Sequence, residues 1–331
     1  MSRLLIVGSV AFDDLEFSKP EGGPPAAHKD VWGGSATYAS LAASLFTKVD
    51  LVAVIGDDFP EASLATLRER GIDTSGVERA NGRSFRWAGR YDPTLGARLT
   101  LDTQLNVFAD FKPKIPAIAA RAPFVLLGNI HPSLQIDVLD QVTRDGMRPK
   151  LVVADTMNFW ITGERATLDK LLKRVDVLVI NDEEARQLGE HHNVSRAAAA
   201  IRAMGPKYLV VKRGEFGALL FDGASGEEKG GVFFAPAYPL EDVYDPTGAG
   251  DTFAGGFLGY LAHVDSLGGK VDRKAMRRAI VAGSAMASFC VEEVGPNRLL
   301  TLTGSQLRDR LAAFRDLVNI EHELDALTLL R

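Results

Sequence analysis

Residues 245–251 read Asp-Pro-Thr-Gly-Ala-Gly-Asp, and residues 252–262 continue as Thr-Phe-Ala-Gly-Gly-Phe-Leu-Gly-Tyr-Leu-Ala. Apolar side chains recur in the second segment at the spacing of one helix face: Phe253, Phe257, Leu258 and Leu261. Such a pattern predicts an α-helix with a buried apolar face. The glycine-rich turn therefore leads directly into a helix, and residues 248–251 lie at its N-terminus.

This helix N-terminus is a place where a phosphate group could bind. Its first N–H groups have no acceptor within the helix, and the helix dipole adds partial positive charge there. Gly248, Ala249 and Gly250 carry little or no side chain, so an anion can approach the backbone. Asp251 would repel that anion unless it has a separate task, such as accepting the proton of an attacking hydroxyl group. The segment thus predicts phosphoryl transfer; alternatively, Asp251 is an ordinary acidic residue in a first helical turn.

The composition argues for a globular protein without a nucleic-acid or membrane partner. The 331 residues are 46% hydrophobic, and this length allows one large domain or two smaller ones. The net charge of −5 argues against binding to nucleic acids or anionic membranes. Cys290 is the only cysteine, and the N-terminus shows neither a signal peptide nor a span of about 20 apolar residues. We therefore expect a cytoplasmic protein.

Short apolar runs alternate with helical patterns along most of the chain. Buried strands are expected at residues 3–8, 51–55, 124–127, 151–154, 177–180 and 208–211, with two antiparallel strands near 218–221 and 232–235. Strands separated by helices predict a parallel sheet. We therefore predict an α/β fold in which a doubly wound, mostly parallel central sheet is covered by helices on both faces. No linker or repeat divides the sequence, so residues 1–331 are expected to form one domain.

A different pattern begins near residue 84. Four residues alternate with more polar neighbours: Phe85, Trp87, Gly89 and Tyr91. This period of two predicts a half-exposed antiparallel strand, with a second strand after the turn at residues 92–96. Together with a turn-rich segment, these strands predict a small β-sheet from about residues 12–32 and 84–110, inserted in the domain. We expect this sheet to act as a lid.

Polar residues gather where the expected parallel strands end: Asp13, Asn129, Asp155, Asn181 and Lys212. The carboxyl ends of such strands form one edge of the sheet, and ligands bind there. The pair Gly33-Gly34 opens another helix at which a ligand could meet free N–H groups, although a simple capping turn is an alternative. The sequence lacks the GxxxxGK[ST], CxxC, HExxH and GxSxG motifs, which leaves P-loop NTPases, zinc proteins and common hydrolases without support.

Six segments occur in the order seen in one kinase family: Gly8-Ser9 with Asp13, Gly33-Gly34, residues 71–77 (Gly-Ile-Asp-Thr-Ser-Gly-Val), Asn181-Asp-Glu-Glu184, Lys212-Arg-Gly214, and residues 245–251. On these residues the chain resembles the ribokinase-like kinases, also called the phosphofructokinase-B type, over residues 3–315. The resemblance implies a ribokinase-like fold and ATP-dependent phosphorylation of a sugar or a nucleoside.

The resemblance also implies roles for individual residues. Asp251 would deprotonate the acceptor hydroxyl, and the backbone of Gly248, Ala249 and Gly250 would hold the transferring phosphoryl group. Glu184 would organise Mg²⁺ and its waters, and Asp245 lies where many relatives bind K⁺, so K⁺ is an additional candidate. Five residues would line the ATP: Asn181, Lys212, Gly214, Gly217 and Gly283. Four residues would face the acceptor: Asp13, Gly33, Gly34 and Asn129.

The chain departs from the family pattern where the acceptor would bind. Many sugar kinases of the family carry an asparagine a few residues after the glycine pair, where this chain has Thr37-Tyr38. Trp160 stands where relatives that take acidic sugars carry an arginine. Tyr38, Trp87, Phe159 and Trp160 could form an aromatic wall for a nucleobase, or could simply pack in the core and the lid.

Three functions therefore remain open. The first is transfer of the γ-phosphoryl group of ATP to a hydroxymethyl group of a small sugar, and the second is a nucleoside kinase of the adenosine type. The third is a catalytically silent sensor of a sugar or nucleotide. In addition, a half-exposed lid sheet needs a partner surface, so we expect a homodimer through the lid.

Overall fold

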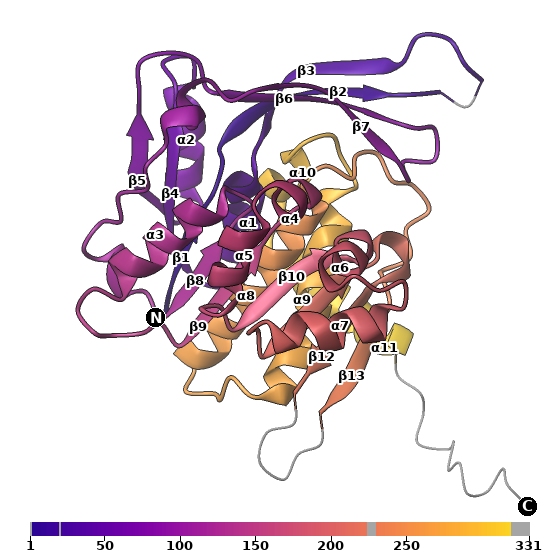
Figure 1. The fold of residues 1–331 in the computed structure, drawn as a ribbon. Helices are drawn as coiled ribbons and strands as arrows, with labels where there is room; N and C mark the ends of the chain where they lie inside the picture. Colours follow the sequence, from indigo (N-terminus) through magenta and orange to yellow (C-terminus); the bar gives the residue numbers. More distant parts are fainter. Residues whose placement is uncertain (1, 20, 224–229, 319–331) are drawn as a thin grey trace, which may run out of the picture.

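The computed structural model describes residues 2–19, 21–223 and 230–318. A nine-stranded sheet forms its centre, in the order β13-β12-β11-β10-β9-β8-β1-β4-β5 (Figure 1). These strands are β1 (Arg3–Val7), β4 (Lys48–Ile55), β5 (Ile72–Arg79), β8 (Phe124–Leu127), β9 (Leu151–Asp155), β10 (Val177–Asn181), β11 (Tyr208–Lys212), β12 (Ala218–Asp222) and β13 (Gly231–Ala235). Neighbours pair in parallel except at β11–β12 and β12–β13. The mostly parallel sheet with two antiparallel strands is confirmed.

Helices cover both faces of this sheet because each central strand is apolar on both sides. Leu4 and Ile6 of β1 lie in one core with α1 (Ser35–Ser44), α8 (Ala249–Ser266) and α9 (Arg273–Cys290). Leu5 and Val7 lie in a second core with α3 (Pro132–Val142), α5 (Arg165–Leu172) and α7 (Val194–Ala203). Strands buried on both faces read as continuous apolar runs.

The remaining helices are shorter or lie at the periphery: α2 (Glu61–Glu69), α4 (Asn158–Gly163), α6 (Asp182–Gly189), α10 (Asn297–Thr301) and α11 (Gly304–Val318). Across the described part of the chain, no helix is both long enough and apolar enough to cross a membrane.

One strand of the central sheet was not predicted. β5 reads Ile-Asp-Thr-Ser-Gly-Val-Glu-Arg and pairs in parallel with β4 at the edge of the sheet. An edge strand is covered less than a central one, so its sequence lacks a continuous apolar run. β4 also begins at Lys48, earlier than the expected Leu51, because Lys48 pairs with Arg3 of β1.

A second sheet of four strands spans the top of the molecule in Figure 1, and we call it the lid. Its order is β3 (Ala26–Gly33), β2 (Ala11–Phe17), β6 (Phe85–Tyr91) and β7 (Arg98–Gln104). β6 pairs in antiparallel fashion with β7, as expected, but it also runs parallel to β2. A small sheet separate from the central one is therefore present.

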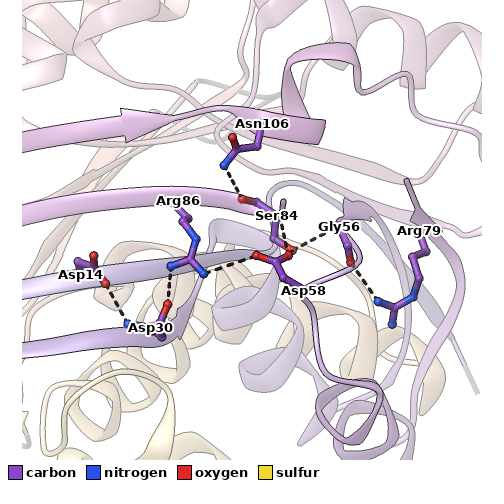
Figure 2. A network of polar contacts seen from close by, with 8 residues as sticks. All are labelled: Asp14, Asp30, Gly56, Asp58, Arg79, Ser84, Arg86 and Asn106. Atoms are coloured by element: carbon purple, nitrogen blue, oxygen red, sulfur yellow. Dashed lines mark hydrogen bonds and ion pairs between the residues drawn. The ribbon is translucent and has the colours of Figure 1, made fainter. Parts of the chain in front are cut away.

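A polar network ties the base of the lid to the loop that follows β4 (Figure 2). The hydroxyl of Ser84, just before β6, donates to Asp58 at 2.7 Å. The side-chain amide of Asn106, just after β7, donates to the carbonyl of Ser84 at 2.9 Å. Arg86 of β6 forms ion pairs with Asp58, at 3.5 Å, and with Asp30 of β3. Both ends of the β6–β7 hairpin are thus held at one point.

Candidate active site

The first turn of α8 presents backbone N–H groups where the sequence predicts a phosphate site. Gly248 caps the helix with a φ of 74°, and a Cβ there would lie 2.4 Å from the ring of Tyr38. Glycine fits this conformation and this contact. The N–H of Ala249 already donates to the carbonyl of Pro246 at 3.2 Å. For the N–H of Gly250 the described residues provide no acceptor, which leaves it available to a ligand.

Asp245 holds the loop that precedes α8. Its two carboxylate oxygens accept hydrogen bonds from the N–H groups of Thr247 and Gly295, each at 2.8 Å. The Thr247 hydroxyl lies 2.9 Å from the hydroxyl of Tyr91 on the lid. The thiol of Cys290 donates to the carbonyl of Thr247 at 3.5 Å. These contacts give Asp245 a structural role, and its part in a K⁺ site stays a prediction.

Asp251 lies in the first turn of α8 and is half-buried. Burial and the charge of Asp155 raise the pKa of Asp251 to about 7, whereas Lys212 and Arg98 act in the opposite direction. A general base works best when its pKa lies near the working pH, because it is then both ionised and basic enough. The position and the proton affinity of Asp251 therefore suit a general base.

Two charged side chains from β9 and β11 meet beside α8. The ammonium of Lys212 lies 3.4 Å from the carboxylate of Asp155. A Cβ on Gly250 would lie 2.9 Å from the Lys212 Nζ, so this ammonium stands against the first turn of α8. Burial by itself would lower the pKa of Lys212, but the charges of Asp155, Glu184 and Asp251 raise it. The side chain is therefore a charged ammonium.

Asn181 and Glu184 cap the start of α6. The Asn181 side chain accepts a hydrogen bond from the Glu184 N–H, and the Glu184 carboxylate accepts one from the Asn181 N–H, each at 2.8 Å. This reciprocal arrangement is a capping box, and it explains the spacing of the two residues. Burial raises the pKa of Glu184 to about 7, while Lys212 lowers it. One carboxylate oxygen of Glu184 is used in the cap, and the other is left for a ligand.

A magnesium ion fits this edge through water and phosphate oxygens rather than through a protein cage. No group of three or more His, Cys, Asp or Glu side chains within the described ranges is arranged to hold a metal ion. Mg²⁺ usually keeps several waters and is bound by one or two carboxylates together with substrate phosphates. The remaining oxygen of Glu184 is a donor of that kind.

The three glycines assigned to the nucleotide all have structural explanations. Gly214 and Gly217 lie in the turn between β11 and β12 with φ values of 53° and 93°. A Cβ on Gly217 would lie 2.1 Å from the carbonyl oxygen of Ala235. A Cβ on Gly283 of α9 would lie 2.8 Å from the carbonyl oxygen of Phe253 in α8. Positive φ and close packing account for these glycines, so contact with a nucleotide stays a prediction.

Asp13 lies on the inner face of the lid, against the glycine pair Gly33-Gly34. A Cβ on Gly33 would lie 2.1 Å from the Asp13 carboxylate, and Gly34 has a φ of 97°. Asp13 is 4% exposed, and its carboxylate finds no hydrogen-bond partner within the described part of the chain. Burial raises the pKa of Asp13 to about 8, and the charges of Asp245 and Asp251 add to this. A buried carboxylate without a partner is costly, and hydroxyl groups of a ligand would satisfy it.

Asn129 follows β8 and is engaged by a neighbouring aromatic residue. Its side-chain oxygen accepts a hydrogen bond from the indole of Trp160 at 2.9 Å. Trp160 also packs edge-on against Phe159, with ring centroids 4.9 Å apart. Tyr38 lies beneath the start of α8, Trp87 lies on the lid, and neither makes a ring contact with this pair in the described structure. The four aromatic residues therefore do not form one wall.

The lid carries a cation that the sequence analysis did not single out. The strand register places Arg98 beside Tyr91, on the same face of the lid as Asp13. The Arg98 guanidinium lies 5.1 Å from the centroid of the Trp87 ring. Its charge lowers the pKa of Asp13 and of Asp251. Strand alternation across the β6–β7 turn was the signal that could have identified it.

The chain matches the family model described as pfkB family carbohydrate kinase over residues 1–301. It is similar to the cytidine kinase of Thermococcus kodakarensis, with 31% identity over 262 residues that cover 78% of this chain and 88% of the relative. It is also similar to the 2-dehydro-3-deoxygluconokinase of Thermoproteus tenax, with 29% identity over 298 residues that cover 82% of each protein.

Among solved structures, the nucleoside kinase of Burkholderia thailandensis in complex with inosine has a TM-score of 0.73 at 19% identity. The match covers 94% of this chain and 98% of that chain. This likeness shows the fold, and it confirms the α/β architecture. The family model spans most of the sequence and carries the activity class. The chain belongs to the pfkB family of carbohydrate kinases, as an ATP-dependent phosphotransferase that acts on a hydroxyl group.

Proposed function

We propose that this protein transfers the γ-phosphoryl group of ATP to a hydroxymethyl group of a small sugar. The observation that carries this proposal is the place of Asp251, which lies beside the ammonium of Lys212 and the free N–H of Gly250. The partnerless carboxylate of Asp13 lies on the lid, near enough for the charge of Asp251 to raise its pKa. The site thus combines three kinds of group: a proton acceptor, hydrogen-bond donors that stabilise negative charge, and a hydrogen-bond acceptor for sugar hydroxyls.

In this mechanism Asp251 takes the proton of the acceptor hydroxyl while the hydroxyl oxygen attacks the γ-phosphorus. The N–H groups at the start of α8 stabilise the charge on the phosphoryl oxygens. Asp13 accepts hydrogen bonds from neighbouring hydroxyls and so orients the acceptor, and closure of the lid excludes water. Glu184 would hold Mg²⁺ through water, and the ion would supply positive charge to the ATP phosphates. Asn181, Gly214, Gly217 and Gly283 would line the nucleotide, and Asn129 the acceptor.

A nucleoside kinase is the second candidate, and the 31% identity to the T. kodakarensis cytidine kinase favours it. The hydroxymethyl group of a ribose would meet Asp13 and Asp251 in the same way as that of a free sugar. The Trp87 ring, with Arg98 stacked on it, offers a flat surface on which a base could rest. A silent sensor has no comparable support, because it needs no general base such as Asp251.

Four further expectations belong to this proposal: one domain, a cytoplasmic location, K⁺ near Asp245, and a homodimer through the lid. The dimer has one supporting observation, since Leu99 and Leu101 of β7 are 60% and 41% exposed. Exposed apolar residues on an edge strand favour a partner surface. Light scattering at micromolar concentration tests this, and a monomer mass would contradict it.

The deciding experiment measures ADP release with Mg-ATP against a panel of pentoses, hexoses, ketoses and nucleosides. Wild-type protein and Asp251→Asn are assayed in parallel. We expect turnover with one acceptor class and its loss in the variant. Turnover with nucleosides alone would select the second candidate. Acceptor-dependent release that is equal in both proteins would overturn the role of Asp251.

A further inference from the structure

Lys212 and Asp155 meet across a strand that lies between them. β9, β10 and β11 are neighbours in the sheet, and the two charged residues are the last residues of the outer strands. Parallel register places Asp155 beside Val179 and Lys212 beside Asn181, so both lie near the end of β10. Their side chains reach over that end to a distance of 3.4 Å. The order of the strands, not proximity in the sequence, creates this pair.

The Lys212 ammonium stands where an anion would bind. Its Nζ is 2.9 Å from the position that a Cβ on Gly250 would take, and the Gly250 N–H has no acceptor among the described residues. A cation beside a helix N-terminus is unfavourable by itself, because the helix dipole places positive charge there. An anion bound between the ammonium and the helix would satisfy both. The Lys212 ammonium and the start of α8 together therefore favour binding of a negatively charged group.

Asp155 is placed to position this ammonium while leaving N–H donors of Lys212 available to a ligand. The side chains of Asp155 and Lys212 are 9% and 17% exposed, so each needs a partner. One Asp155 oxygen accepts the N–H of Thr156 at 2.8 Å, and the other faces Lys212. The 3.4 Å separation is longer than the roughly 2.7–2.9 Å of a strong charge-assisted bond. Lysine has three N–H donors, and in the described structure Asp155 is the one acceptor they meet.

We propose that Lys212 is a catalytic residue whose ammonium donates hydrogen bonds to the transferring phosphoryl group, and that Asp155 is its positioning residue. This inference rests on the proposed phosphoryl transfer. In that step the bond between the γ-phosphorus and the oxygen it shares with the β-phosphorus breaks, and a bond to the acceptor oxygen forms. The acceptor proton passes to Asp251. Lys212 keeps its protons and stabilises the charge on the phosphoryl oxygens.

The test compares binding of ATP with binding of ADP, which lacks the transferring group. Each nucleotide is titrated with Mg²⁺ by calorimetry into wild type, Lys212→Gln, Asp155→Asn and the double variant. Lys212→Gln should weaken ATP binding about 10-fold and leave ADP binding unchanged, because one charge-assisted contact to the γ-phosphoryl group is lost. Its kcat should fall about 100- to 1000-fold, as when a donor to a developing oxyanion is removed.

The positioning role of Asp155 is tested by non-additivity. Asp155→Asn should lose part of the preference for ATP over ADP and part of kcat, with no change in the KM for the acceptor. The double variant should be no worse than Lys212→Gln, because Asp155 acts through Lys212. Lys212→Arg keeps a cation at this place and should recover part of the ATP preference. Additive losses in the double variant would overturn the positioning role.

Two control variants separate this role from a structural one. Lys207→Gln removes an exposed lysine just before β11, and it should leave both affinities unchanged. Asp176→Asn removes a carboxylate that accepts the Val152 N–H at the other end of the sheet, so it should lower Tm without changing the ATP preference.

Equal losses of ATP and ADP affinity in Lys212→Gln would place Lys212 along the nucleotide and refute the inference. A lower Tm with both affinities unchanged would show a structural ion pair and refute it as well. Because these titrations need no acceptor, they give a result even if no acceptor-dependent ADP release is found. That last finding would refute the proposed function alone.

Discussion

The carboxyl edge of the central sheet and the inner face of the lid both carry carboxylates that are buried or half-buried, but the surrounding structure holds them differently. At the edge, Asp155 ends a strand paired on both sides, and Asp251 begins a helix whose next turns lie in the core. On the lid, Asp13 lies in a four-stranded sheet in which every residue of β7 is exposed. The lid joins the body through the network around Ser84 (Figure 2).

This contrast teaches how the two tasks of a kinase are divided. Groups that take part in the chemical step need fixed geometry, and strands packed on both faces provide it. Groups that admit and enclose the acceptor need to move, and a separate sheet with an exposed edge strand, β7, is suited to that. Changes at the edge should therefore lower kcat, and changes on the lid should raise the KM for the acceptor.

The largest effect is expected for Asp251→Asn at the edge. Loss of the general base should lower kcat by about 10²- to 10⁴-fold, while ATP still binds. In wild type, kcat should rise as pH increases through about 7, because Asp251 must be ionised to accept a proton. ADP release and calorimetry measure the two quantities. A kcat close to that of wild type would show that Asp251 takes no part in the chemical step. The proposed division of tasks between the sheet edge and the lid would then be wrong.

The next effect is expected for Asp13→Asn on the lid. The variant loses charged hydrogen bonds to acceptor hydroxyls, so kcat/KM for the acceptor should fall about 10- to 100-fold with the KM for ATP unchanged. Asp14→Asn is a matched control, because the Asp14 side chain accepts the Asp30 N–H within the lid instead. Steady-state kinetics with each substrate varied in turn measures kcat/KM for the acceptor and the KM for ATP. Equal losses in both variants would contradict a specific role of Asp13.

The same substitution should stabilise the ligand-free protein. The pKa of Asp13 is raised to about 8 by burial, so the folded state holds a proton that the unfolded chain releases near its ordinary pKa of about 4. The stability associated with neutral Asp13 is present below pH 4 and is lost as pH rises toward 8. Asp13→Asn avoids this loss, so its gain in Tm should grow between pH 4 and pH 8. A constant difference in Tm across this range would contradict the burial argument.

The smallest effect is expected for Arg86→Gln at the base of the lid. Its partner Asp30 is 63% exposed, and a solvent-screened ion pair contributes about 0–1 kcal/mol, so Tm should change by only a few degrees. The KM for the acceptor should rise a few-fold, because the hairpin loses its pairs with Asp58 and Asp30, and kcat should stay the same. Arg90→Gln is the control, since Arg90 pairs with Glu16 inside the lid. A lower kcat in Arg86→Gln would show that the lid takes part in the chemical step.

Much of the fold was predictable because its strands are buried on both faces. The runs at β1, β8, β9, β10 and β11 are continuous apolar segments, and the sequence shows them directly. β5 was missed because an edge strand tolerates polar residues. The parallel pairing of β2 with β6 was also missed, because a long-range pairing leaves no local pattern.

The site was predictable where its residues are neighbours in the sequence. Gly248, Gly250 and Asp251 are neighbours in the sequence, and the following helix places them together. Arg98 was not found, since its face depends on where the β6–β7 turn lies. The capping box of Asn181 and Glu184 was visible as a spacing, but its hydrogen bonds needed the structure.

By itself the sequence determined the fold class, the glycine-rich start of α8 and the identity of Asp251, because periodicity and helix capping are local properties. The tertiary structure decided that Lys212 and Asp155 meet across β10, and that Asp13 on the lid is buried near enough to Asp251 for that charge to raise its pKa. Residues 57 positions apart come within 3.4 Å only when strand order and register are set. Those depend on how the whole chain packs, because pairing between distant strands is selected by burial of both sheet faces at once.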